Sequence, residues 1–120
     1  MVADQVGSPT SARSLAEATV KALAHRAEGT YHATGAGVTS WHGFAERIVA
    51  AGSQLGLCHK VPVRPITTAD YPTPARRPAY SVLDNGRLQA ELDIRLPNWE
   101  VALDQCLAEI KGAGPRLSPG

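Results

Sequence analysis

The proline-rich segment from 70 to 84 restricts the fold of this chain more than any other part of its sequence. Within it, Pro72, Pro74 and Pro78 each fix φ and lack a backbone N–H donor. The segment can therefore form neither a regular helix nor a central strand. Regular elements must lie before and after it.

Two adjacent guanidinium groups, those of Arg76 and Arg77, lie on this stiffened backbone. Guanidinium is well suited to bidentate capture of phosphate or carboxylate. A rigid loop also loses little conformational entropy when it binds a ligand. The segment is thus either a solvated proline-rich connection or a substrate-binding loop for an anionic group.

Composition narrows the class of protein. A chain of 120 residues with 43% hydrophobic and 19% charged residues fits one globular domain with a modest core. A net charge of +1 and 5% aromatic residues argue against a nucleic-acid partner. No apolar run predicts a membrane span, and no signal peptide is expected. Cys58 and Cys106 lack CxxC spacing, which favours free thiols in a cytoplasmic protein.

Hydrophobic periodicity predicts four helices, over about 11–26, 41–55, 85–92 and 97–111. Thr10 is expected to cap the first helix, Thr39 or Ser40 the second, and Asp84 the third. The predicted buried stripe of the first helix consists of Leu15, Ala16, Thr19, Val20 and Leu23. Trp41 begins the predicted buried stripe of the second helix, and Cys106 belongs to that of the last.

Short strands are expected over 30–33 and 61–66, and they are too few to form an independent sheet. Residues 1–10 have the pattern of a strand end that runs into a turn, so we expect the chain to begin inside a larger fold. The predicted domain covers residues 1–111. A glycine- and proline-rich tail over 112–120 is expected to be disordered.

A glycine-rich turn over 35–40 lies between a predicted strand and a predicted helix, as in dinucleotide-binding sites. However, Ser40 occupies the third glycine position, and no acid follows about twenty residues later. A tight turn with a helix cap explains these residues better. We therefore expect no cofactor to be bound by this chain alone.

Catalytic and metal-binding patterns are also missing. Tyr31, Tyr71 and Tyr80 are each followed four residues later by a residue other than lysine, so no tyrosine–lysine pair can transfer a proton. No catalytic residue is assigned for this reason. The histidines lack metal-ligand spacing, and no metal site is expected.

The segment 4–10 combines polar side chains, a glycine and a helix start. A helix N-terminus is a natural anion site, so Asp4, Gln5 and Thr10 are candidate binding residues. The alternative is a structural turn between a strand and a capped helix.

Five motifs in order resemble the C-terminal part of the dTDP-4-dehydrorhamnose reductases, which are extended short-chain dehydrogenase/reductases. The resemblance covers about residues 2–111. The motifs are Asp4-Gln5-x-Gly7-Ser8-Pro9-Thr10, Gly29-Thr30-Tyr31-His32, Gly37-Val38-Thr39-Ser40-Trp41-x-x-Phe44-Ala45, Tyr71-Pro72-Thr73-Pro74-Ala75-Arg76-Arg77-Pro78-x-x-Ser81-x-Leu83-Asp84, and Leu96-Pro97-x-Trp99-x-x-Ala102-Leu103.

The resemblance implies a part in the NADPH-dependent reduction of dTDP-4-dehydro-L-rhamnose to dTDP-L-rhamnose, a precursor of bacterial surface polysaccharide. In this family the Rossmann half binds the cofactor and supplies the Tyr-x-x-x-Lys pair, and the C-terminal half forms the sugar-nucleotide site. The expected fold is accordingly a small, helix-rich α/β substrate domain without the Rossmann half. That half would be supplied in cis or in trans.

The resemblance also implies which residues bind the dTDP-sugar, namely Asp4, Gln5, Thr10, Arg76 and Arg77. A homodimer is compatible with it. Some relatives carry a metal-binding glutamate near the position of Arg13, and a cation there argues against that site. Two alternatives to a reductase part stay open, a non-catalytic binding or regulatory module and a decayed product without function, whose open sheet edges would favour aggregation.

Overall fold

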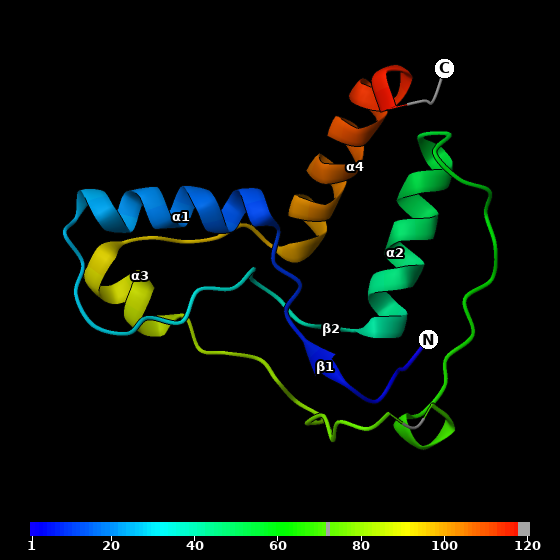
Figure 1. The fold of residues 1–120 in the computed structure, drawn as a ribbon, viewed down its shortest axis with the longest axis horizontal. Coiled ribbons are helices and arrows are strands. Elements are labelled where there is room, and N and C mark those ends of the chain that lie inside the picture. Colours follow the sequence, from blue (N-terminus) through cyan, green and yellow to red (C-terminus); the bar gives the residue numbers. More distant parts are fainter. Residues whose placement is uncertain (72, 118–120) are drawn as a thin grey trace.

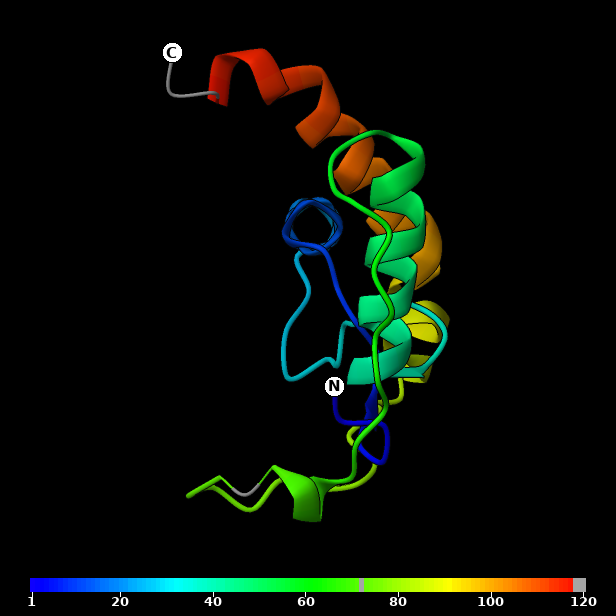
Figure 2. The same cartoon turned by 90° about the vertical axis from the view of Figure 1, so that its right-hand side faces the viewer.

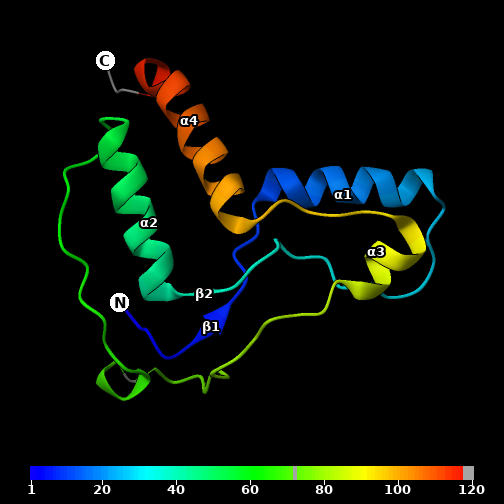
Figure 3. The same ribbon diagram turned by 180° about the vertical axis from the view of Figure 1, so that it is seen from behind.

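The computed structural model describes residues 1–71 and 73–117. α2 and α4 lie side by side, and α1 lies above α3 on the other side of α4 (Figures 1 and 3). In chain order the elements are β1 (Val6–Gly7), α1 (Ala12–Ala24), β2 (Thr39–Ser40), α2 (Trp41–Gln54), the 3-10 helix η1 (Thr68–Asp70), α3 (Gly86–Leu92) and α4 (Trp99–Leu117).

The short strand β1 joins distant parts of the chain. It pairs antiparallel with β2, with Val6 opposite Ser40. On its other side the Val6 amide donates to the Ala79 carbonyl at 2.7 Å, and the Ser81 amide donates to the Val6 carbonyl at 2.9 Å. β1 therefore holds the start of α2 and the end of the proline-rich segment next to each other.

The helix termini follow local side-chain chemistry. Ser11, one residue after the predicted cap, accepts a hydrogen bond from the Ser14 amide at 3.0 Å and caps α1. Ser40 caps α2 by accepting from the Gly43 amide at 3.0 Å, as predicted. Asn85 is the N-cap residue of α3, while Asp84 accepts from the Gly86 amide at 2.8 Å.

The prediction for the buried side of α1 was wrong. The helix buries Ser14 and Ala18, and Ala22 packs against the core. The expected stripe instead lies on the surface, with Leu23 73% exposed and Val20 66% exposed. The small side chains of Ala18 and Ala22 pack against the core that α3 contributes to, and the larger side chains lie on the other side of α1.

The core is small and lies under α1. It consists of Ala18, Leu88, Leu92, Ile94 and Leu96. A second contact joins α2 to α4, where the rings of Phe44 and Trp99 meet edge to face at 6.0 Å. Cys106, expected on the buried side of α4, is exposed, and both cysteines are free thiols.

Much of the molecule faces solvent. Its accessible surface is 8435 Å², whereas a compact protein of 12.7 kDa exposes roughly 6,200 Å². The radius of gyration is 16.8 Å, against about 14 Å for a compact domain of this length. The described elements therefore leave several faces that no other described part of the chain covers.

The predicted strands did not form as regular elements. Residues 30–33 are extended without a strand partner, and in the segment 61–66 only Ile66 forms a bridge, to Val2. α4 begins at Trp99 and runs to Leu117, beyond the end expected at 111. Residues 118–120 of the expected tail, and Pro72, lie outside the described residues. No helix in the described part of the chain has the length and apolarity needed to cross a membrane.

Candidate functional site

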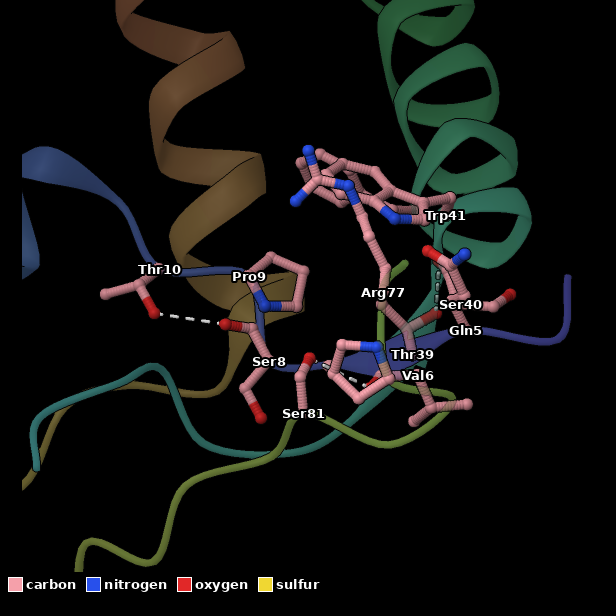
Figure 4. Close-up of a pocket in the computed structure, with 13 residues that line it drawn as sticks. Gln5, Val6, Ser8, Pro9, Thr10, Thr39, Ser40, Trp41, Arg77 and Ser81 are labelled. Carbon is pink, nitrogen blue, oxygen red and sulfur yellow. Dashed lines mark hydrogen bonds between the residues drawn. The ribbon is translucent and has the colours of Figure 1, made fainter. Parts of the chain in front are cut away.

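A cleft of about 430 Å³ opens where β1, the start of α2 and the proline-rich segment meet (Figure 4). Because β1 pairs with both neighbours, residues far apart in sequence share this cleft. Its lining includes Gln5, Pro9, Thr10, Trp41, Arg77 and Ser81.

The turn at the end of β1 is fixed by hydrogen bonds. The Ser8 hydroxyl donates to the Gly37 carbonyl at 2.7 Å. The Thr10 hydroxyl donates to the Ser8 carbonyl at 3.1 Å and accepts from the Gly35 amide at 2.9 Å. Thr10, a candidate binding residue from the sequence, thus lines the cleft, and its hydroxyl also holds the wall of the cleft in place.

Asp4 and Gln5 are divided between two cavities. Gln5 lines the cleft, and its amide donates to the Thr68 hydroxyl at 3.2 Å. Asp4 lies outside the cleft, in a neighbouring cavity of about 520 Å³, and accepts hydrogen bonds from the Thr68 amide and hydroxyl at 2.8 and 2.7 Å. Asp4 therefore anchors η1 beside the cleft.

The two arginines also differ in position. Arg77 lines both cavities, whereas Arg76 lines only the one that contains Asp4. Among the described residues, no carboxylate lies within ion-pairing distance of either guanidinium. Among the described residues that line the cleft, Arg77 is the only charged one, so an anion there would meet a cation without a competing carboxylate.

Trp41 was expected in the core, and this was wrong. It is 54% exposed and lines the cleft. As the first residue of α2 it precedes the turn in which Phe44 packs against Trp99, so its ring stays open to solvent. With Pro9 and Pro78 it gives the cleft an apolar wall. A cation beside such a wall suits a ligand that joins an anionic group to a flat or apolar one.

The glycine-rich turn over 35–40 does not fit a dinucleotide. A Cβ atom on Gly35 would lie 2.3 Å from the Pro9 carbonyl oxygen, so this glycine is needed for packing. Gly37 has φ +80° and abuts Asn98 and Trp99. Ser40 already occupies the Gly43 amide at the start of α2. The two glycines thus serve packing and a tight turn, and Ser40 serves as the cap of α2, as in the structural interpretation of this turn.

Charged residues elsewhere form ion pairs. Arg13 forms one ion pair with Glu109 and another with Glu17, the latter at 3.3 Å. The nearby carboxylates, Glu109 first, raise the pKa of the Arg13 guanidinium. The position at which some relatives are expected to hold a metal thus carries an ion pair. Within residues 1–71 and 73–117, no three side chains of His, Cys, Asp or Glu cluster in a way that could hold a metal ion.

Replacing Asp4 with asparagine is expected to lower stability in a pH-dependent way. Two hydrogen bonds from Thr68 lower the pKa of Asp4 below its ordinary value. The bond from the Thr68 amide has the larger effect, and the bond from the Thr68 hydroxyl has the smaller one. A lowered pKa contributes stability that is present above the unfolded pKa, about 3.9, and is lost as pH falls through the folded value. The difference in urea midpoint between wild type and Asp4→Asn should therefore be larger at pH 7 than at pH 3. An equal difference in urea midpoint at pH 7 and pH 3 would contradict a role for the charge of Asp4. The control variant is Glu28→Gln, because Glu28 is exposed.

The chain matches known proteins over almost its whole described length. The family model described as the RmlD substrate binding domain matches residues 1–111. The dTDP-4-dehydrorhamnose reductase of Burkholderia thailandensis is 46% identical over 92% of this chain and 41% of its own length. The spore coat polysaccharide biosynthesis protein SpsK of Bacillus subtilis is 38% identical, over 94% of this chain and 38% of its own. The chain spans about two fifths of the length of these relatives.

Solved structures agree with the fold. A dTDP-4-dehydrorhamnose reductase from Clostridium acetobutylicum superposes with a TM-score of 0.84 at 34% identity, over 92% of this chain and 39% of that one. The dTDP-4-dehydrorhamnose reductase of Bacillus anthracis, solved in complex with NADP, superposes with a TM-score of 0.82 at 33% identity. The match covers 90% of this chain and 37% of that one. The expected helix-rich α/β fold is confirmed. Because the family model, the relatives and these structures coincide on the segment that forms the cleft, this chain belongs to the RmlD substrate-binding domain family.

Proposed function

We propose that this chain is the dTDP-sugar-binding part of a dTDP-4-dehydrorhamnose reductase that reduces dTDP-4-dehydro-L-rhamnose with NADPH in the cytoplasm. The observation that carries the proposal is the cleft in which Arg77 lies beside an apolar wall, in a member of a substrate-binding domain family. The names of the relatives supply the substrate and the reaction class.

Each side chain of the cleft has a role in this proposal. Arg77 binds the diphosphate, because its guanidinium can donate two parallel hydrogen bonds to phosphate oxygens. Trp41 supports the flat base or the apolar side of the sugar. Gln5 and Thr10 face the sugar, and Arg76 with Asp4 shapes the neighbouring cavity.

The chain contributes binding and orientation to the reaction. A bound sugar nucleotide held at both its diphosphate and its base presents the sugar in a restricted set of orientations, which lowers the entropic part of the barrier. The nucleotide-binding half, in cis or in trans, would hold NADPH and supply the groups that transfer hydride and proton. Turnover of substrate by the purified chain alone would contradict this division.

Calorimetric titration of the purified chain tests the proposal. We expect dTDP and dTDP-rhamnose to bind with measurable heat, and thymidine, which lacks the diphosphate, to bind at least tenfold more weakly. The reason is that the charge-assisted hydrogen bonds to Arg77 require phosphate oxygens. Absence of heat with dTDP, for a chain shown by circular dichroism to be folded, would overturn the proposal.

A further inference from the structure

His42, in the first turn of α2, contacts three parts of the chain. Its backbone amide donates to the Val2 carbonyl at 2.9 Å. Its ring nitrogen Nε2 lies 2.8 Å from the Val63 carbonyl oxygen, and Nδ1 lies 3.1 Å from a carboxylate oxygen of Glu46. The His42 side chain is 17% exposed, whereas that of Glu46 is 58% exposed. His42 is thus held between its own helix, the N-terminal segment and residues 61–66, which we call the connecting segment.

Both partners of the His42 ring are hydrogen-bond acceptors. The Val63 carbonyl has no proton to donate, and neither does the ionised carboxylate of Glu46. A neutral imidazole has one donor nitrogen and one acceptor nitrogen, so it can satisfy only one of these partners. The imidazolium ion has two donors and satisfies both. The arrangement therefore fits the charged form of the ring, which donates to Val63 and to Glu46.

Few other charged groups lie on the segments that contact His42. Among the described residues, Glu46 is the one carboxylate within ion-pairing distance of the ring. On the N-terminal segment, the Met1 ammonium donates to the Arg64 carbonyl at 2.7 Å, and the Asp4 carboxylate is bonded to η1. Arg64 adds a guanidinium on the connecting segment. Protonation of the ring is therefore the change that acts directly on the contact between α2 and the connecting segment.

The connecting segment leads from α2 toward the cleft. Figures 1 and 2 show the chain that leaves α2 running back along that helix to η1, with the N-terminus beside the start of α2. At its end the Ile66 amide donates to the Met1 carbonyl at 2.8 Å, and the Ile66 carbonyl accepts from the Ala3 amide at 2.7 Å. The connecting segment is thus fastened to the N-terminal segment just before β1.

Both ends of this connection reach the cleft. Trp41 directly precedes His42 and lines the cleft. At the other end, η1 follows the connecting segment, and its Thr68 hydroxyl accepts a hydrogen bond from Gln5, which also lines the cleft. Among the described residues, the contact between His42 and Val63 is the only hydrogen bond from α2 to the connecting segment. Its strength therefore affects how firmly Trp41 and Gln5 are held relative to each other.

We propose that His42 is a positioning residue for the cleft, whose charged ring fastens the start of α2 to the connecting segment and so favours binding of a sugar nucleotide. The inference rests on the proposed function, because it concerns the site assigned there to the dTDP-sugar. When the ring loses its proton, an acceptor nitrogen faces an acceptor oxygen and one contact is lost. A neutral ring that still donates to Val63 makes a bond roughly half as strong as the charged ring does. The fraction of the chain in the fastened arrangement falls, and the apparent affinity falls with it.

Calorimetric titration of the complete chain with dTDP-rhamnose at pH 5.5 and pH 7.0 tests the inference. Histidine side chains lose their charge over this range, whereas carboxylates stay ionised. dTDP-rhamnose is the ligand because both its phosphates are esterified, whereas the terminal phosphate of dTDP loses a proton at about pH 6. We expect about threefold weaker binding at pH 7.0 than at pH 5.5, because fewer molecules then have the fastened arrangement.

Two variants isolate the ring and its partner. His42→Gln keeps a donor for Val63 without a group that titrates, so its affinity should be the same at both pH values. Glu46→Gln changes an exposed side chain and offers a donor as well as an acceptor. A neutral ring can then keep both contacts, and the pH effect should largely disappear. His59→Gln is the matched control, because it removes an exposed histidine and should leave the threefold effect in place.

Equal affinity of wild type at pH 5.5 and pH 7.0 would overturn the inference. An undiminished pH effect in His42→Gln or in Glu46→Gln would also overturn it. The second of these variants lies on the surface, so it does not depend on how well the chain tolerates a change at the ring.

A measurement without ligand separates this inference from the proposed function. In NMR spectra of the free chain, the Trp41 indole signal should shift with pH along the titration curve of the His42 ring, and this shift should be absent in His42→Gln. If dTDP-rhamnose binds at neither pH while Trp41 follows the ring, the proposed function is wrong and the positioning of Trp41 stands. A Trp41 signal that does not follow the ring would overturn the inference, whether or not the sugar nucleotide binds.

Discussion

Replacing Arg77 with alanine is expected to weaken binding of dTDP to this chain about 10- to 100-fold. The variant removes the one charged side chain found among the described residues that line the cleft. A hydrogen bond to a charged group contributes about 1.5–3 kcal/mol, which corresponds to that range of affinity. The loss should appear in calorimetric titration as a higher dissociation constant with an unchanged stoichiometry.

Two further variants isolate the cause. Arg77→Lys keeps the charge but loses the planar pair of donors, so its affinity should fall between those of wild type and Arg77→Ala. Arg76→Ala removes a neighbouring cation that does not line the cleft, and a loss of less than about fivefold is expected from reduced long-range attraction alone. Equal losses for Arg76→Ala and Arg77→Ala would contradict the placement of the diphosphate at Arg77.

Replacing Gly35 with alanine is expected to destabilise the chain by about 3 kcal/mol, because overpacking of this kind forces backbone to move. Gly35 is buried, and its new Cβ atom would lie 2.3 Å from the backbone oxygen of Pro9, which cannot rotate away. The hydrogen bond from the Gly35 amide to Thr10 would stretch as the two segments part. Since Pro9 and Thr10 line the cleft, affinity for dTDP should fall together with stability.

Thermal unfolding measures this effect, and a drop of about 10 °C or more in Tm is expected for a domain of this size. Gly112→Ala is the matched control. It makes the same chemical change on an exposed part of α4, where a Cβ atom would meet nothing within 4 Å. That variant should gain up to about 1 kcal/mol from helix propensity. An unchanged Tm for Gly35→Ala would show that the turn at Pro9 can move freely.

Local chemistry explains what could be predicted. The Ser40 cap, the irregular course of the proline-rich segment and the approximate helix bounds depend on residues a few positions apart. The motif order also led to the family, because each motif is short and contiguous. Among the candidate site residues, Gln5, Thr10 and Arg77 do meet in one cleft, although no local pattern could show that Asp4 and Arg76 lie beside it.

The errors share one cause. Apolar residues at helical spacing indicate an apolar helix face. They do not indicate which other part of the protein, if any, packs against that face. Leu23 on α1 and Trp41 on α2 both belong to such faces and are exposed in this chain. Residues 30–33 alternate between packed and exposed side chains, as a strand does, but pair with no strand in the part of the chain that the structure describes.

The sequence by itself determined the approximate helix bounds, the Ser40 cap, the stiff arginine-bearing segment and the family, because these follow from side-chain chemistry over short spans. Only the tertiary structure decided that β1 joins the start of α2 to the end of the proline-rich segment. That pairing creates the cleft and places Arg77, but not Arg76, in its lining. The physical reason is that backbone hydrogen bonds between distant segments fix positions that no local spacing encodes.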